Sequence, residues 1–94
     1  MFSHLESEVV SVVTSNGDIV GKLKQATDSM VILEDPRGFV QTQDGVGFAP
    51  SVSIGCDHEL SEVTFNMAMV LTITKTHEEI EKAWRQQTSG IVTS

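Results

Sequence analysis

The sequence predicts a single, mainly β domain that ends in one α-helix. Short segments rich in β-branched residues alternate with turn signals, and a helix-start pattern follows the last of them. The chain has 94 residues, of which 39% are hydrophobic, enough for one modest core. No repeat or linker divides it. We therefore expect one domain over residues 1–94, with strands over about 8–75 and a helix over about 77–88.

The first two strands are predicted to form a hairpin. Residues 8–14 are dense in valine, and Asn16-Gly17 supplies the positive φ angles of a tight turn. In residues 18–25, Ile19, Gly21 and Leu23 alternate with Val20, Lys22 and Lys24, as in a β-strand. Gly21, inside this second strand, has no Cβ and allows a sharp bend. We expect the sheet to begin to curl here.

A third strand completes a three-stranded meander. Thr27-Asp28-Ser29 forms the turn, and residues 30–34 form a strand that we expect to stop before Pro36, because proline cannot donate to a ladder. Glycines and a proline weaken the signal after residue 37. Short strands are expected there over 38–42 and 51–54.

The segment from Val63 to Thr74 has the composition of one long strand or two abutting strands. We expect a bend near Met69, with Phe65, Met67 and Met69 on one face at period two.

A helix should follow this segment. Thr76 and Glu79 fit a capping box, and His77 would be the first helical residue. The spacing places one face against the strands; its residues are Ile80, Ala83, Trp84 and Gln87. Trp84 is interpreted as the anchor of the helix rather than as a stacking platform.

Charge and location restrict the function classes. Thirteen acidic residues against six Lys and Arg give a formal net charge of −7, which repels polyphosphates unless a local basic patch exists. Lone Cys56 cannot form an intramolecular disulfide, and the first residues lack the pattern of a signal peptide. We expect a cytoplasmic protein. Its most apolar stretch, 65–73, is shorter than the about 18 residues of a membrane span.

Residues 10–35 resemble the first sequence motif of the Sm-like family: a hydrophobic strand, Asn16-Gly17, Gly21-Lys22-Leu23, a polar turn with Asp28, and Met30-Val31-Ile32-Leu33. The resemblance implies a small, strongly bent five-stranded barrel with the helix at its C-terminal side. It also implies a homo-oligomeric ring in which outer strands of neighbours pair. The expected interface side chains are Phe65, Met67, Met69, Leu71 and Ile73.

The same resemblance implies single-stranded RNA as a partner. The expected RNA-binding residues are Thr27, Asp28, Ser29, Met30, Val31, Lys22 and Arg37. The chain departs from the family in three places: Thr27 holds the usual Asp position, Val31 holds the usual Asn position, and the Arg-Gly pair of the second motif is missing. These departures favour an alternative, a ring that binds a protein partner and no RNA.

Other candidate chemistry is weaker. Cys56-Asp57-His58-Glu59 contains metal-ligand types but lacks a second ligand pair, so an acidic loop is the better interpretation, and no metal site is expected. The Cys-His pair also lacks a third orienting group for nucleophilic catalysis. We expect no catalytic residue, no enzyme activity and no cofactor. Phe39 and Phe48 could stack on bases, but a place in the core is favoured about two to one.

Overall fold

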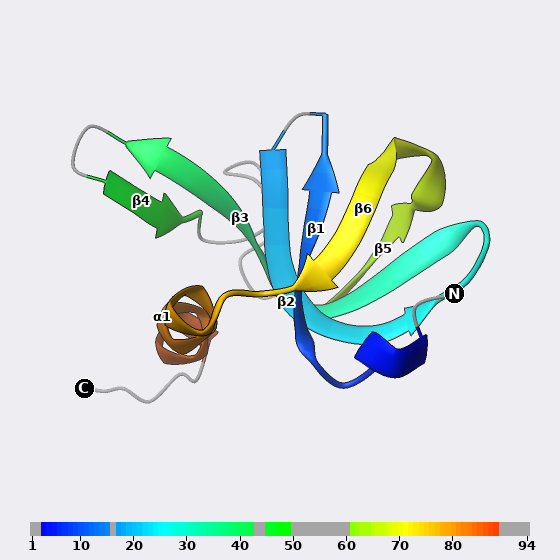
Figure 1. Cartoon of the computed structure of the whole chain (residues 1–94), viewed down its shortest axis with the longest axis horizontal. Helices are drawn as coiled ribbons and strands as arrows, with labels where there is room; N and C mark the ends of the chain where they lie inside the picture. Colours follow the sequence, from blue (N-terminus) through cyan, green and yellow to red (C-terminus); the bar gives the residue numbers. More distant parts are fainter. Residues whose placement is uncertain (1–2, 16, 43–44, 50–60, 89–94) are drawn as a thin grey trace.

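The computed structural model describes residues 3–15, 17–42, 45–49 and 61–88, and it confirms a mainly β fold with a C-terminal helix (Figure 1). Within the described residues no helix has the length and apolar character needed to cross a bilayer. The elements in chain order are η1 (Ser3–Leu5), β1 (Val9–Thr14), β2 (Gly17–Ala26), β3 (Met30–Thr42), β4 (Gly45–Phe48), β5 (Glu62–Asn66), η2 (Met67–Met69), β6 (Val70–Lys75) and α1 (Glu78–Thr88).

The strands form one antiparallel sheet in the order β4-β3-β2-β1-β6, and β5 pairs with β3 as well. The predicted hairpin is present, because β1 and β2 pair from Thr14↔Gly17 outward, and Gly17 has a φ of 132° that favours glycine. The meander of β1, β2 and β3 is also confirmed. The described sheet has six strands because a short strand, β4, adds to the five expected.

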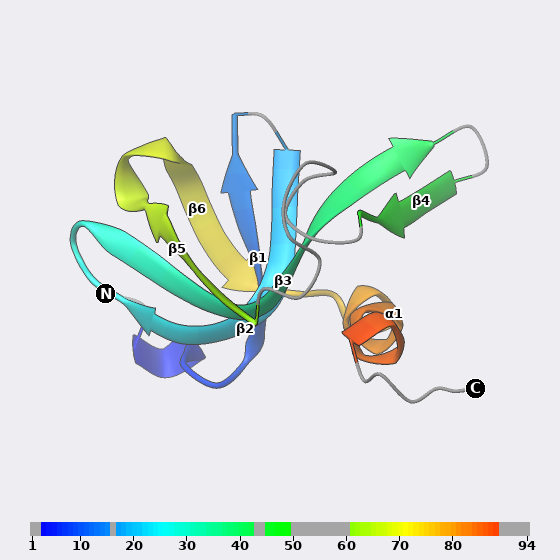
Figure 2. The same cartoon turned by 180° about the vertical axis from the view of Figure 1, so that it is seen from behind.

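Strand β3 does not stop before Pro36, which corrects the predicted boundary. Its first part pairs with β5 up to Glu34↔Glu62, and its last part pairs with β4 from Phe39↔Phe48 onward. Figure 2 shows β5 along the first part of β3, while the end of β3 runs away from the sheet with β4. Pro36 lies between these two ladders, so its missing N–H removes no hydrogen bond from either.

A β-bulge marks the point where β3 changes partners. The register with β2 shifts between Val20↔Arg37 and Lys22↔Glu34, and Asp35 has a positive φ of 49°. Gly21 faces this bulge, and a Cβ on it would lie 3.1 Å from the Pro36 Cα. The expectation that Gly21 permits a sharp bend is therefore confirmed.

Two clusters of buried side chains hold the fold together. The larger lies inside the curved sheet and comprises Leu5, Val10, Val12, Leu23, Val31, Leu33 and Ile73. The smaller lies beneath α1 and comprises Val9, Val20 and Trp84, with Phe39, Phe48 and Ile80 packed against them. The rings of Phe39 and Phe48 are 5.2 Å apart. Phe39 and Phe48 therefore pack against the core, which is the alternative that the sequence favoured over base stacking.

The predicted bend near Met69 is a single turn of 3-10 helix, η2, between β5 and β6. Asn66 caps it, since its Oδ1 accepts a hydrogen bond from the Ala68 N–H at 2.9 Å. Phe65 and Met67 both pack against the larger core cluster, as the period-two pattern predicts, whereas Met69 is 45% exposed and leaves this face.

Helix α1 has the predicted extent, but a different residue caps it. His77 Nδ1 accepts a hydrogen bond from the Glu79 N–H at 3.1 Å, so His77 is the N-cap rather than the first helical residue. The hydroxyl of Thr76 lies 3.0 Å from the Ser11 hydroxyl instead. It joins the end of β6 to β1.

The face of α1 that docks on the sheet is narrower than predicted. Trp84 is buried, and its Nε1–H donates to the Asp35 carbonyl at 2.9 Å. Ile80 and Glu81 are partly buried beside it, whereas Ala83 and Gln87 are exposed. The prediction for these last two was wrong, because the helix rests on one side chain per turn rather than on a broad stripe. The anchoring role of Trp84 is confirmed.

Candidate functional site

The turn between β2 and β3 is a compact loop held by its own hydroxyl groups. Thr27 Oγ1 accepts hydrogen bonds from the Ser29 N–H at 3.3 Å and the Met30 N–H at 3.2 Å. The Thr27 N–H donates to the Met30 carbonyl at 2.8 Å. Asp28 and Ser29 are exposed at the tip. The turn is thus ordered, with a carboxylate and a hydroxyl pointing to solvent.

This turn lies against η2, from a distant part of the sequence. The Met67 N–H donates to the Ser29 carbonyl at 3.0 Å, and Met30 is the ladder partner of Asn66. The β2–β3 turn and η2, which lie far apart in the sequence, are therefore neighbours. We call this surface the turn end; it consists of Asp28, Ser29, Met30, Asn66, Met67 and Met69.

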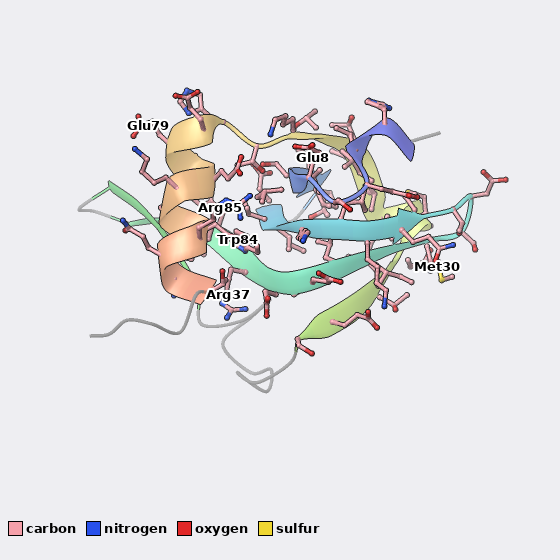
Figure 3. All side chains as sticks on the ribbon, turned by 90° about the horizontal axis from the view of Figure 1, so that it is seen from below. Glu8, Met30, Arg37, Glu79, Trp84 and Arg85 are labelled. Carbon is pink, nitrogen blue, oxygen red and sulfur yellow. The ribbon has the colours of Figure 1, made fainter. Side chains whose placement is uncertain are left out.

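The expected RNA-binding residues do not all gather there. Met30 lies at the turn end and Arg37 at the other end of the sheet, beside α1 and Trp84 (Figure 3). The Arg37 guanidinium donates to the Pro36 carbonyl at 3.0 Å. The Val31 side chain is fully buried in the larger core cluster. Only its backbone can face a ligand.

The lysines of β2 add little positive charge to the turn end. Lys24 Nζ forms an ion pair with Glu62 of β5, and this hydrogen bond raises the pKa of the lysine. Lys22 is exposed further along β2 and makes no ion pair within the described part of the chain. Residues 25–31 and 66–71, which build the turn end and its flanks, contain no Lys or Arg.

A second surface is formed by the two outer strands of the curved sheet. In the described ladders β5 pairs with β3 alone and β6 with β1 alone, so the other backbone edge of each strand faces away from the sheet. The two strands are consecutive and are joined by η2, yet they border opposite edges of the sheet. In Figure 3, β6 (yellow) and β5 (green) lie on either side of β2 and β3.

Leu71 is the most exposed large hydrophobic side chain among the described residues, at 69%. The register of β1 with β6 passes from Val13↔Thr72 to Thr14↔Val70, so Leu71 is the extra residue of a bulge and has no ladder partner on β1. Met69, two residues earlier at the end of η2, is 45% exposed. Phe65 and Met67 are half-buried against the core. Ile73 lies in the core itself, so its side chain has little surface to offer a partner.

Comparisons with known proteins show the fold and nothing finer. No family model matches the sequence, and no curated protein matches it. The crystal structure of the NatC complex bound to CoA contains a chain with a similar fold, at a TM-score of 0.53 and 12% sequence identity. The match covers 88% of this chain and 94% of that one. At this identity the likeness concerns the path of the backbone alone.

The described residues offer little other chemistry. They contain no group of three or more His, Cys, Asp or Glu side chains placed to hold a metal ion. Cys56-Asp57-His58-Glu59 lies outside the described residues. A shallow surface pocket of about 270 Å³ runs along α1, where Glu78, Glu81, Lys82 and Arg85 line it. These are solvated side chains of one helix.

Sequence reasoning missed two features of these surfaces. It did not place Ser29 beside Met67, because a contact between residues this far apart leaves no trace in local pattern. It also did not predict the bulge at Leu71, since the run Val70-Leu71-Thr72-Ile73 is equally compatible with an unbroken strand. A usable signal was Asn66, whose side chain is typical of a cap before a short helical turn.

Proposed function

We propose that this chain is a non-enzymatic, Sm-like subunit that assembles into a homo-oligomeric ring and serves as a platform for a protein partner. In this assembly β5 of one copy pairs with β6 of the next. The observation that carries the proposal is that, in the described ladders, β5 and β6 each pair on one side only and border opposite edges of one curved sheet. Such edges join head to tail and can close a ring.

The side chains at these edges support the pairing. Leu71 and Met69 are largely exposed on the β6 side, and covering them on assembly removes apolar surface from water. The chain is small, so burial within one copy leaves it marginally stable, and a partner surface adds stability. The chain of similar fold in the NatC complex is likewise part of a complex.

The test is the mass of the protein in solution, measured by light scattering behind a sizing column. We expect a defined species of about five to eight protomers. Leu71→Asp places a charge at the new contact and should shift the mass toward the monomer. Val40→Asp is the matched control, since Val40 is 44% exposed on β3, beyond its pairing with β5. A monomeric wild-type protein would contradict the proposal.

RNA binding is the second candidate, and one observation favours it. The β2–β3 turn, which holds most of the expected RNA-binding residues, is ordered and meets η2 through the Ser29–Met67 hydrogen bond. Against it stands the lack of Lys and Arg in both segments. Fluorescence anisotropy with short U-rich and A-rich RNAs at two salt concentrations tests it. Base-selective binding that Met30→Ala and Lys22→Ala weaken would support it.

A further inference from the structure

The turn end combines features that RNA binding does not require. Three of the four methionines of the chain gather there, namely Met30, Met67 and Met69. Met69 is 45% exposed, and the other two are half-buried. Unbranched thioether side chains adapt their shape to different apolar partners and contact aromatic rings favourably. Met69 and the exposed parts of the other two side chains therefore give the turn end apolar surface.

Its charge has one sign. Asp28 is exposed at the tip of the β2–β3 turn, and η1, with exposed Glu6 just after it, lies toward the same end of the molecule (Figures 1 and 3). Lys24, the nearest basic residue of β2 in sequence, is paired with Glu62. The Asp28 carboxylate beside apolar surface attracts cations and repels phosphate groups.

We propose that the turn end binds a basic protein segment with apolar anchor residues. Lys or Arg of that segment pairs with Asp28, while its apolar side chains cover Met69 and the exposed parts of Met30 and Met67. The inference rests on the proposed function in one respect, since it names the partner class of the platform. Peptide binding at the turn end does not depend on how many copies of the chain assemble.

The charge of the turn end distinguishes a basic peptide from RNA as its partner. A phosphate backbone brought to the turn end meets the Asp28 carboxylate and finds no Lys or Arg in residues 25–31 or 66–71. A basic peptide meets the same carboxylate favourably. Changing the sign of residue 28 should therefore move the two affinities in opposite directions.

The experiment is a fluorescence-anisotropy titration with three labelled probes on protein whose mass has been measured first. The probes are a short peptide of Lys, Arg and Leu, the same peptide with Glu in place of the basic residues, and a U-rich RNA of similar length. We expect the basic peptide alone to bind, more weakly at higher salt. Asp28→Lys should weaken it about tenfold, and Met69→Ser should weaken it by a smaller factor.

Asp18→Lys is the control, because it makes the same charge change at the start of β2, next to the β1–β2 turn and on a different part of the sheet. It should leave peptide affinity unchanged, and circular dichroism checks the fold of each variant. Equal binding of the acidic peptide, equal loss with Asp18→Lys, no binding at low salt, or RNA binding that Asp28→Lys tightens would each overturn the inference. If the protein assembles but does not bind the basic peptide, the peptide site is contradicted and the ring is not. If the protein is monomeric but binds the peptide, the ring is contradicted and the peptide site is not.

Discussion

At the scale of single residues, the fold depends on the point where β3 changes partners. Asp35 adopts a positive φ there, its N–H donates to the Ser61 carbonyl at 2.8 Å, and its own carbonyl accepts from Trp84. Both backbone polar groups of the bulge are therefore satisfied. Gly21 packs directly against this bulge, so the curvature of the sheet depends on a residue without a side chain.

Replacing Gly21 by alanine should destabilise the protein. The added Cβ would lie 3.1 Å from the Pro36 Cα and 3.2 Å from the Glu34 carbonyl oxygen, and both are backbone atoms of a buried strand that cannot yield cheaply. We expect a loss of about 1–3 kcal/mol in the free energy of unfolding, measured by urea denaturation.

Gly47→Ala supplies the comparison for this change. A Cβ on Gly47 would meet no atom within 4 Å, so the stability should stay within about 0.5 kcal/mol of the wild-type value. If both variants lost the same stability, the cause would be a general effect of removing strand glycines rather than the contact at the bulge.

At the scale of elements, α1 is fastened to the sheet by polar contacts around its single buried anchor. Lys75 Nζ, at the end of β6, lies 3.1 Å from Glu8 Oε1 and 3.5 Å from Glu81 Oε1. Glu81 also accepts two hydrogen bonds from the Arg85 guanidinium. The hydrogen bond from Arg85, followed by the charge of Lys75, lowers the pKa of Glu81 below its ordinary value of 4.5.

This shift predicts how stability depends on pH. Because the folded state favours the ionised carboxylate, Glu81 contributes stability above pH 4.5 and loses it as the pH falls through the lower, folded pKa. Glu81→Gln should therefore be less stable than wild type at neutral pH, and the two should converge in acid. Urea denaturation across this pH range measures the difference. A gap that stays constant with pH would assign the effect to packing.

The elements that local pattern determines were predictable, and those that depend on distant contacts were not. Gly17, with its positive φ, and the Thr27 turn set the meander through their own geometry. Alternation or helical spacing set β1, β2 and α1. Pro36 led to a wrong end for the third strand. A proline within a strand normally costs a ladder hydrogen bond, but Pro36 lies at a bulge between two ladders, where no such bond is lost, and only the tertiary fold shows this. The same holds for the turn end, whose two halves lie far apart in the sequence.

At the scale of the whole molecule, charge opposes the proposed assembly. Each chain carries a formal net charge of −7, so a ring concentrates negative charge and its copies repel one another. Dissolved salt screens this repulsion over distances of about 10 Å at 0.1 M ionic strength. The contacts proposed at Leu71 and Met69 are apolar, so moderate salt would not weaken them.

Higher salt should therefore favour the assembled state at low protein concentration. Sedimentation velocity at low and moderate sodium chloride concentrations measures the fraction of each species. Leu71→Asp should remain mostly monomeric in both, because screening does not restore the apolar contact. Dissociation of the wild-type protein by added salt would mean that ion pairs dominate the interface between copies.

The hydrogen bond between Trp84 and the Asp35 carbonyl has a consequence for the order of folding during synthesis. Helix α1 follows every strand in the sequence, so the bulge and the apolar cluster of Val9, Val20, Phe39 and Phe48 are made before their cover exists. During synthesis this face stays exposed to solvent until Trp84 emerges from the ribosome. A nascent chain whose strands have emerged from the ribosome, but whose Trp84 has not, therefore exposes this apolar face of the sheet to solvent and to chaperones.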